Sequence, residues 1–103
     1  MRKARIFMLG KFAGLLEEGE RGTWIFRYAH SYAGPPISLT MPIEQKDHDF
    51  DSFPPFFEGL LPEGEMLDGL LRQLKIDRKD YFTQLIAVGA DTVGAVTVVE
   101  DGE

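Results

Sequence analysis

The sequence predicts an α+β fold in which helices pack on one face of an antiparallel sheet. The first half contains two apolar runs around a turn and two stretches that alternate with the period of a β-strand, and the second half carries apolar stripes with helical spacing. A last short apolar run predicts one more strand. Strands followed by helices favour an antiparallel sheet over a parallel one. The 103 residues suffice for one domain, which we assign to residues 1–103.

Four strands are expected in the N-terminal half. Ala4–Leu9 and Phe12–Leu16 flank a Gly-Lys turn and predict a hairpin. Thr23–Tyr28 and Ile37–Met41 both alternate with a period of two, and prolines limit the second of them. The acidic stretch Asp47–Asp51 predicts a loop.

Three helices and a final strand are expected after the acidic stretch. Pro54 and Pro55 suit the first turn of a helix that continues through Leu61. The apolar spacing from Met66 to Leu74 predicts an amphipathic helix. A third helix is expected to be capped by Asp77 and to end at Gly89, before a strand at Ala95–Val99.

Large apolar side chains on these elements predict the core. The expected helix positions are Leu67, Leu70, Leu71, Phe82, Leu85 and Ile86, packed against Trp24, Phe26 and Tyr28 of the sheet. The three sheet aromatics could instead stack on nucleic-acid bases, but a sheet covered by helices buries such residues, and the core interpretation is favoured. The Met66–Leu74 stripe could form a partner groove, although its use in the domain's own core is favoured too.

Charge and composition limit the classes of function. With 17 acidic and 11 basic residues the formal net charge is −6, which disfavours direct binding to nucleic acid or to an anionic membrane surface. No apolar run is long enough to cross a bilayer, and the basic residues near Met1 are not followed by a signal-peptide core. The sequence has no cysteine, which fits a reducing cytoplasm. We therefore expect a cytoplasmic location.

The sequence contains no enzyme motif. Phosphate-binding glycine loops, the His-Glu-x-x-His pattern and the nucleophile elbow are missing, so we expect no catalytic residues and no cofactor. His48 lies among Asp47, Asp49 and Asp51, but the ligand order and turn glycine of a calcium loop are missing, and we expect no metal site.

The segment Phe53–Gly64 has an unusual composition. It reads FPPFFEGLLPEG, which is more apolar surface than one face of a short helix can hide. It either wedges into the core or forms a partner-binding surface. In the second case Pro62–Met66 would be an exposed tip.

The same segment resembles the Pro-Phe-Phe-x-x-Leu-Leu-Pro-Glu-Gly signature of the N-terminal subdomain of HipA-type serine/threonine kinases. Ile86–Val96 reads IAVGADTVGAV and is similar to that family's Val-Gly-Gly-Asp-x-x-Gly-Ala segment, with Ala90 in place of the second glycine. Ile37–Pro42 resembles its Leu-Ser-Leu-x-Leu-Pro strand. The resemblance covers Ile6 to Val99, whereas the family's ATP loop, catalytic aspartate and metal ligands have no counterpart in this chain.

The resemblance implies a role in a bacterial toxin–antitoxin system. Some operons split the kinase, so that the N-terminal subdomain is a separate HipS-like antitoxin of a HipBST-type system, which binds and inhibits a shorter, HipT-type HipA-like serine/threonine kinase. A HipB-type helix-turn-helix repressor is a second candidate partner. We expect the kinase to be contacted by Phe56, Phe57, Leu61, Pro62, Glu63, Gly64, Glu65 and Met66.

Two other functions stay open. The chain could be a non-catalytic piece of a full-length HipA-type kinase, or it could stabilise a repressor complex without touching DNA. A downstream kinase reading frame that begins without this subdomain would favour the antitoxin.

Overall fold

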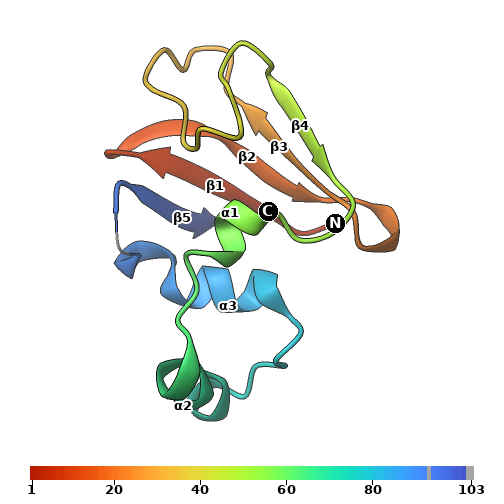
Figure 1. Cartoon of the computed structure of the whole chain (residues 1–103), viewed down its shortest axis with the longest axis vertical. Coiled ribbons are helices and arrows are strands. Elements are labelled where there is room, and N and C mark those ends of the chain that lie inside the picture. Colours follow the sequence, from red (N-terminus) through yellow and green to blue (C-terminus); the bar gives the residue numbers. More distant parts are fainter. Residues whose placement is uncertain (93, 102–103) are drawn as a thin grey trace.

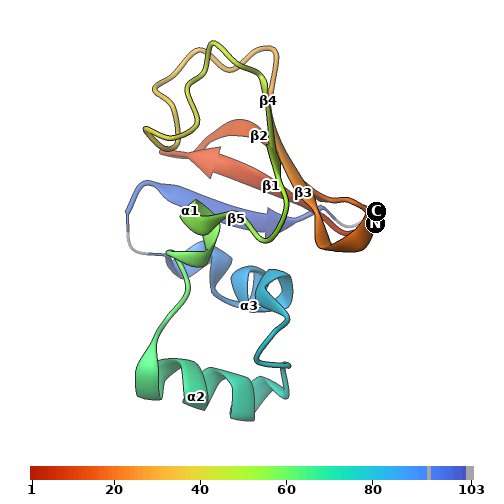
Figure 2. The same cartoon turned by 45° about the vertical axis from the view of Figure 1, so that its right-hand side comes forward.

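The computed structural model describes residues 1–92 and 94–101, so Val93, Gly102 and Glu103 lie outside the described residues. Five antiparallel strands form one sheet in the order β4-β3-β2-β1-β5. The elements are β1 (Lys3–Met8), β2 (Lys11–Glu18), η1 (Glu20–Gly22), β3 (Trp24–Tyr28), β4 (Asp47–Phe50), α1 (Pro55–Glu58), α2 (Gly64–Leu74), α3 (Tyr81–Val88), η2 (Gly89–Asp91) and β5 (Val96–Glu100). Helices α1 and α3 lie on one side of the sheet, and α2 lies beyond α3 (Figures 1 and 2). The predicted α+β class is confirmed.

Four of the predicted strands are present. β1 and β2 form the expected hairpin, with a bulge between Ile6 and Phe7. β3 pairs with β2, and β5 returns from the helices to pair with β1 at the sheet edge. The prediction succeeded here because each strand carries a local signal. For β1 and β2 it is an apolar run beside a turn, for β3 it is alternation with a period of two, and for β5 it is a last apolar run.

The acidic stretch predicted as a loop is instead the edge strand β4. His48 is opposite Phe26 and Phe50 is opposite Trp24, so every second residue faces the core. His48 is buried, with its Nε2 3.0 Å from the backbone oxygen of Pro42, while Asp47 and Asp49 point to the other side. The loop prediction was wrong because low strand propensity was outweighed by pairing with β3.

The expected strand at Ile37–Met41 is a tight turn. The amide of Met41 donates to the oxygen of Ser38, and the two residues form only an isolated bridge. The hydroxyl of Tyr28 donates to the oxygen of Met41 at 2.5 Å and accepts from the amide of Ile37 at 3.0 Å. This buried hydroxyl therefore ties both ends of the turn to β3, and the turn leaves Leu39 95% exposed.

The core lies between the sheet and the two inner helices. Trp24, Phe26 and Tyr28 are buried, as expected. The ring of Trp24 stacks on Phe82 of α3 at 5.6 Å, and the ring of Phe26 contacts Phe57 of α1 at 5.9 Å. These aromatic pairs join each inner helix to the same strand, so the interpretation of the stripe as core is confirmed.

α3 begins and ends differently from the prediction. Its N-cap is Asp80, whose carboxylate accepts from the amide and hydroxyl of Thr83, whereas Asp77 forms the preceding turn with Lys79. The helix ends at Gly89 as predicted, but for a tertiary reason. A Cβ at Gly89 would lie 2.1 Å from the backbone oxygen of Val98, so the close approach of β5 requires glycine there.

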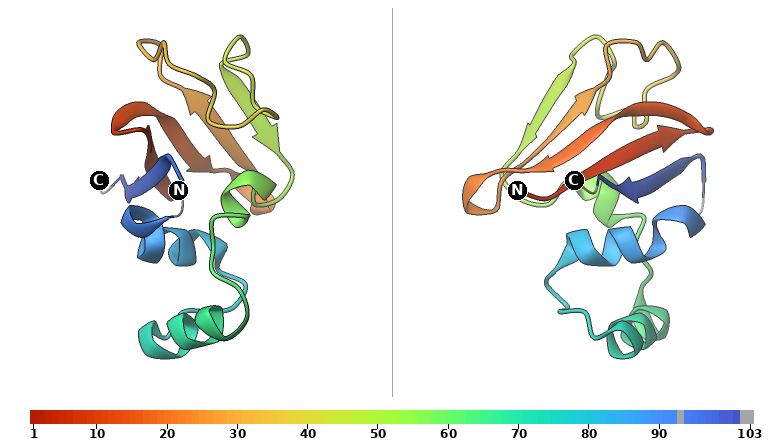
Figure 3. Two further views of the ribbon diagram at one scale, coloured as in Figure 1. Left: turned by 60° about the vertical axis from the view of Figure 1, so that its left-hand side comes forward. Right: turned by 180° about the vertical axis from the view of Figure 1, so that it is seen from behind.

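α2 does not pack on the sheet. Figure 3 shows it as a separate outer layer, with α3 between it and the strands. Leu71 is buried but lies outside the core cluster, and Leu67 and Leu70 are only half-buried. The expected burial against the sheet is therefore wrong for α2 and correct for Phe82 and Leu85, while Ile86 is half-buried at the edge of the core.

A cluster around Arg2 ties α3 to the sheet. The guanidinium of Arg2 is 3.1 Å from a carboxylate oxygen of Glu18 and 2.8 Å from one of Asp80, and it lies over the ring of Phe82 at 5.0 Å. The hydrogen bond from Arg2 lowers the pKa of Glu18 against the opposing effect of burial. Burial would raise the pKa of Asp80, but hydrogen bonds from Thr83 and Arg2 outweigh it and lower that pKa.

None of the helices within residues 1–92 and 94–101 combines the length and the hydropathy that a membrane span requires.

Candidate partner-binding site

The segment Phe53–Gly64 divides into a buried half and an exposed half. Phe53, Pro54 and Phe57 are buried, and Phe57 has no exposed surface. The amides of Phe57 and Glu58 both donate to the oxygen of Pro54, which closes the single turn of α1. Proline at the first position of α1 costs no hydrogen bond. This half is a wedge in the core, and Phe57 is not available to a partner.

The remaining predicted contact residues differ in exposure. Leu61 is buried at the edge of the core with 9% exposure, Phe56 and Pro62 are half-buried, and Glu63, Gly64, Glu65 and Met66 are exposed. Gly64 has φ +61°, a left-handed conformation that favours glycine, and α2 begins there. The chain therefore leaves the core at Leu61 and turns at Gly64. We call the segment Pro62–Met66 the tip.

An apolar groove adjoins the tip. It has a volume of about 460 Å³. It lies between the exit from α1, α2 and the C-terminal end of α3. Its apolar lining residues are Leu60, Leu61, Pro62, Met66, Leu70 and Val88. Met66 is 76% exposed and Leu74 52% exposed, so the α2 stripe that was expected in the core is partly accessible from outside.

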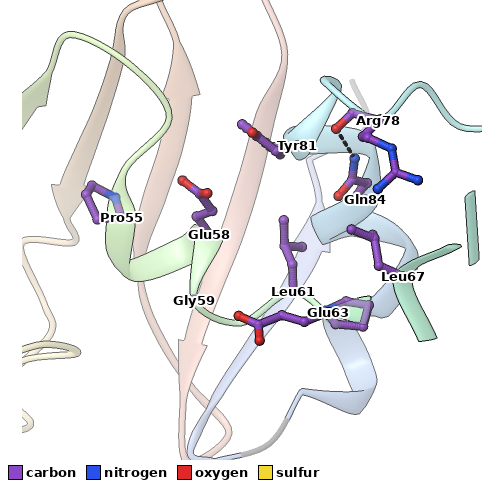
Figure 4. A pocket seen from close by; sticks show the side chains of 10 residues that line it. Pro55, Glu58, Gly59, Leu61, Glu63, Leu67, Arg78, Tyr81 and Gln84 are labelled. Carbon is purple, nitrogen blue, oxygen red and sulfur yellow. Dashed lines mark hydrogen bonds between the residues drawn. The ribbon is translucent and has the colours of Figure 1, made fainter. Parts of the chain in front are cut away.

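A second hollow shares Gly59, Leu61 and Pro62 with the groove. We call it the acidic pocket, because the carboxylates of Glu58 and Glu63 line it (Figure 4). Its volume is about 570 Å³. Its other lining residues are Pro55, Gly59, Leu61, Pro62, Leu67, Arg78, Tyr81 and Gln84.

The sequence predicted Pro62–Met66 as an exposed tip, but it did not predict the groove or the acidic pocket. Glu58 comes from α1, and Tyr81 and Gln84 come from α3, more than twenty positions later in the chain. Val88 likewise reaches the groove from the end of α3. No local pattern connects such residues, because the turn at Gly64 and the position of α2 bring them together.

The described residues contain no group of three or more histidine, cysteine, aspartate or glutamate side chains that could hold a metal ion.

The chain is similar to known proteins over almost its full length. The model of the HipA N-terminal domain family matches residues 4–99. An uncharacterized protein of Haemophilus influenzae is 38% identical over 101 residues, which cover 98% of this chain and 94% of that protein. The serine/threonine-protein kinase toxin HipA of Shewanella oneidensis is 33% identical over 70 residues, 68% of this chain but only 16% of the toxin.

A solved structure agrees with these sequence matches. The N-terminal domain of HipA toxin superposes with a TM-score of 0.79 at 33% identity, covering all of this chain and 95% of that one. The sequence match, the shared fold and the Phe53–Gly64 signature agree: the chain belongs to the HipA N-terminal domain family.

Proposed function

We propose that this chain is an antitoxin that binds a HipA-like serine/threonine kinase and inhibits it by protein–protein contact. One observation carries the proposal: the exposed tip lies beside an apolar groove. The tip leads into α2, and the residues of α2 are not part of the domain's core cluster. Apolar surface next to a stiff protrusion suits a partner interface, because little free energy is lost in ordering it on binding.

The relatives support this assignment in two ways. The match to the Haemophilus influenzae protein covers 94% of that protein, so a relative of about this length exists. The match to the Shewanella oneidensis toxin covers only 16% of it, and the chain lacks the motifs with which a kinase holds ATP and magnesium. We infer that the chain is not itself an enzyme, and that it acts in the cytoplasm.

In this mechanism the tip enters the kinase's active-site cleft. Glu63, Glu65 and Met66 would obstruct nucleotide or substrate, and Phe56, Leu61 and the groove would supply apolar contact. Pro62 and Gly64 would hold the tip in shape, since proline fixes one backbone angle and Gly64 occupies a left-handed conformation.

The test replaces Glu63, Glu65 and Met66 together with alanine. Because all three side chains are exposed, we expect the melting temperature to stay close to that of the parent and growth rescue against a co-expressed HipA-like kinase to weaken. The matched control is Glu20→Ala, Glu44→Ala and Leu39→Ala, which removes two exposed carboxylates and one exposed apolar side chain elsewhere. Undiminished rescue by a folded tip variant would show that the tip is not the inhibitory contact.

The alternative, a structural subdomain of a kinase, predicts the opposite effect on activity. Adding the purified chain to a kinase that lacks this domain would then raise phosphotransfer, whereas an antitoxin would lower it. A contribution to a complex with a HipB-type repressor is a separate hypothesis, tested by whether the chain joins the repressor on operator DNA.

A further inference from the structure

The acidic pocket contains a buried hydrogen-bond acceptor that the described part of the chain leaves unused. Gln84 is 1% exposed, and its Nε2 donates to the backbone oxygens of Asp77 at 3.1 Å and Arg78 at 2.9 Å. Since carbonyl oxygens only accept, these two bonds fix the orientation of the amide. Oε1 lies at the opposite end, turned toward the pocket, and no described group donates to it (Figure 4).

Only a small part of this oxygen reaches the pocket surface, because Gln84 as a whole is 1% exposed, but the oxygen is not fully enclosed. Within the described residues, no fully enclosed side-chain nitrogen or oxygen lacks a hydrogen-bond partner. An acceptor at the wall of a pocket favours a ligand that brings a hydrogen-bond donor, because the protein itself provides no donor to this oxygen among the described residues.

The charge of the pocket favours a cation. Neither Glu58 nor Glu63 takes part in an ion pair or side-chain hydrogen bond with any described residue. Arg78 is the only basic residue in the lining, and its guanidinium already donates to the carboxylate of Asp68 at 2.6 Å. The two glutamates therefore leave the pocket with uncompensated negative charge.

The remaining walls suit a long side chain with an apolar stem. Leu61 and Leu67 line the pocket together with the two glutamates and Gln84, and Tyr81 offers an aromatic ring (Figure 4). A volume of about 570 Å³ exceeds what one side chain needs and leaves space for the backbone that carries it.

We propose that this pocket receives an arginine side chain of the partner kinase, an inference that rests on the proposed function. Arginine provides five donors in a planar fork, enough to reach the amide oxygen of Gln84 and a carboxylate at once, and its stem packs on apolar walls. The three donors of lysine lie on a single nitrogen, so lysine is less able to bond to the Gln84 oxygen and to a carboxylate at the same time. The arginine would anchor the kinase beside the tip.

The first test uses the chain alone with acetyl-arginine-amide as the probe, followed by ¹H–¹⁵N NMR. We expect chemical-shift changes at the side-chain amide of Gln84 and around Leu67, smaller ones with acetyl-lysine-amide, and none with the uncharged acetyl-citrulline-amide. The variant Glu58→Gln with Glu63→Gln keeps the shape and removes both charges, and should weaken binding about tenfold or more. The matched control, Glu20→Gln with Glu44→Gln, should bind like the parent.

The second test measures the Kd of the purified kinase for Glu58→Gln alone, because Glu63 also belongs to the tip, and uses Glu20→Gln as the matched control. We expect Glu58→Gln to weaken binding about tenfold or more and the control to bind like the parent. Equal affinities of the pocket variant and the parent for the kinase overturn the inference, as does an arginine titration that leaves the pocket signals unmoved. If the kinase binds neither the parent chain nor any variant, the proposed function is wrong. In that case the arginine cannot come from the kinase, whatever the NMR titration shows.

Discussion

At the scale of single residues, Arg2 joins three parts of the fold. It connects the end of β2 through Glu18, the N-cap of α3 through Asp80, and the aromatic core through Phe82. Its side chain is 41% exposed, so solvent screens each ion pair and the separate contributions are modest. Their effect is to fix the start of α3 on the sheet.

We predict that Arg2→Ala lowers the free energy of unfolding by about 1–2 kcal/mol. Exposed ion pairs contribute about 0.2–1 kcal/mol each and a cation over an aromatic ring about 0.5–1 kcal/mol. Chemical denaturation at neutral pH measures the change. Lys79→Ala, which removes an exposed charge nearby, is the control and should stay within about 0.5 kcal/mol of the parent.

The same cluster predicts a pH dependence. Glu18 and Asp80 have folded-state pKa values below their ordinary ones, so the unfolded chain binds protons more readily. The stability they provide is present above the unfolded pKa values, about 4.3 and 3.9, and is lost as the pH falls through the lower folded values. Denaturation between neutral pH and about pH 3 should show a smaller acid-induced loss in Arg2→Ala than in the parent. Parallel curves would contradict the pairing.

Two glycines give opposite predictions for the same substitution. Gly89→Ala places a Cβ 2.1 Å from the backbone oxygen of Val98 and should strongly destabilise the junction of α3 and β5. Gly69→Ala, in α2, meets no atom within 4 Å and should stabilise that helix by up to about 1 kcal/mol. Thermal melts of both variants test the pair, and a tolerated Gly89→Ala would show that β5 lies further from α3.

At the scale of elements, α3 and α2 are held by different forces. α3 is joined to the sheet by aromatic stacking and by the Arg2 cluster. α2 is connected by the turn at Gly64 and by an exposed ion pair between Asp68, in the middle of the helix, and Arg78. Few of its apolar residues are deeply buried, so α2 should open more readily than the rest of the domain.

We predict that Phe82→Ala lowers the free energy of unfolding more than Leu71→Ala does, and that the two variants loosen different parts of the domain. Phe82 is 2% exposed in the core and its loss should cost about 3–5 kcal/mol, whereas Leu71 lies outside the core cluster and should cost about 2 kcal/mol or less. Hydrogen exchange should show faster exchange confined to α2 in Leu71→Ala and spread over sheet and helices in Phe82→Ala. Equal, global effects would mean that α2 is part of the core.

At the scale of the whole molecule, the proposed contact surface lies at one end. Figure 2 shows α2 at this end, away from the sheet. Residues of α2 line both the groove and the acidic pocket, and the tip leads into the same helix. The net charge of −6 favours a partner with a basic contact surface.

This arrangement predicts where a bound kinase would change the chain. Hydrogen exchange in the complex should slow most in residues 60–74, because binding would cover the apolar stripe of α2, while β1–β3 should exchange as in the free chain. The free chain measured at the same concentration is the control. Protection centred on the sheet instead would place the interface elsewhere.

The sequence by itself determined the elements whose residues carry their own periodicity, together with the family through the Phe53–Gly64 signature. It could not determine β4, since Asp47–Phe50 becomes a strand only through pairing with β3, nor the turn at Ile37–Met41, which the hydroxyl of Tyr28 holds in place. The tertiary structure alone decided the position of α2. An amphipathic helix must bury its apolar face somewhere, but its spacing does not say whether a sheet, a neighbouring helix or a partner will cover it.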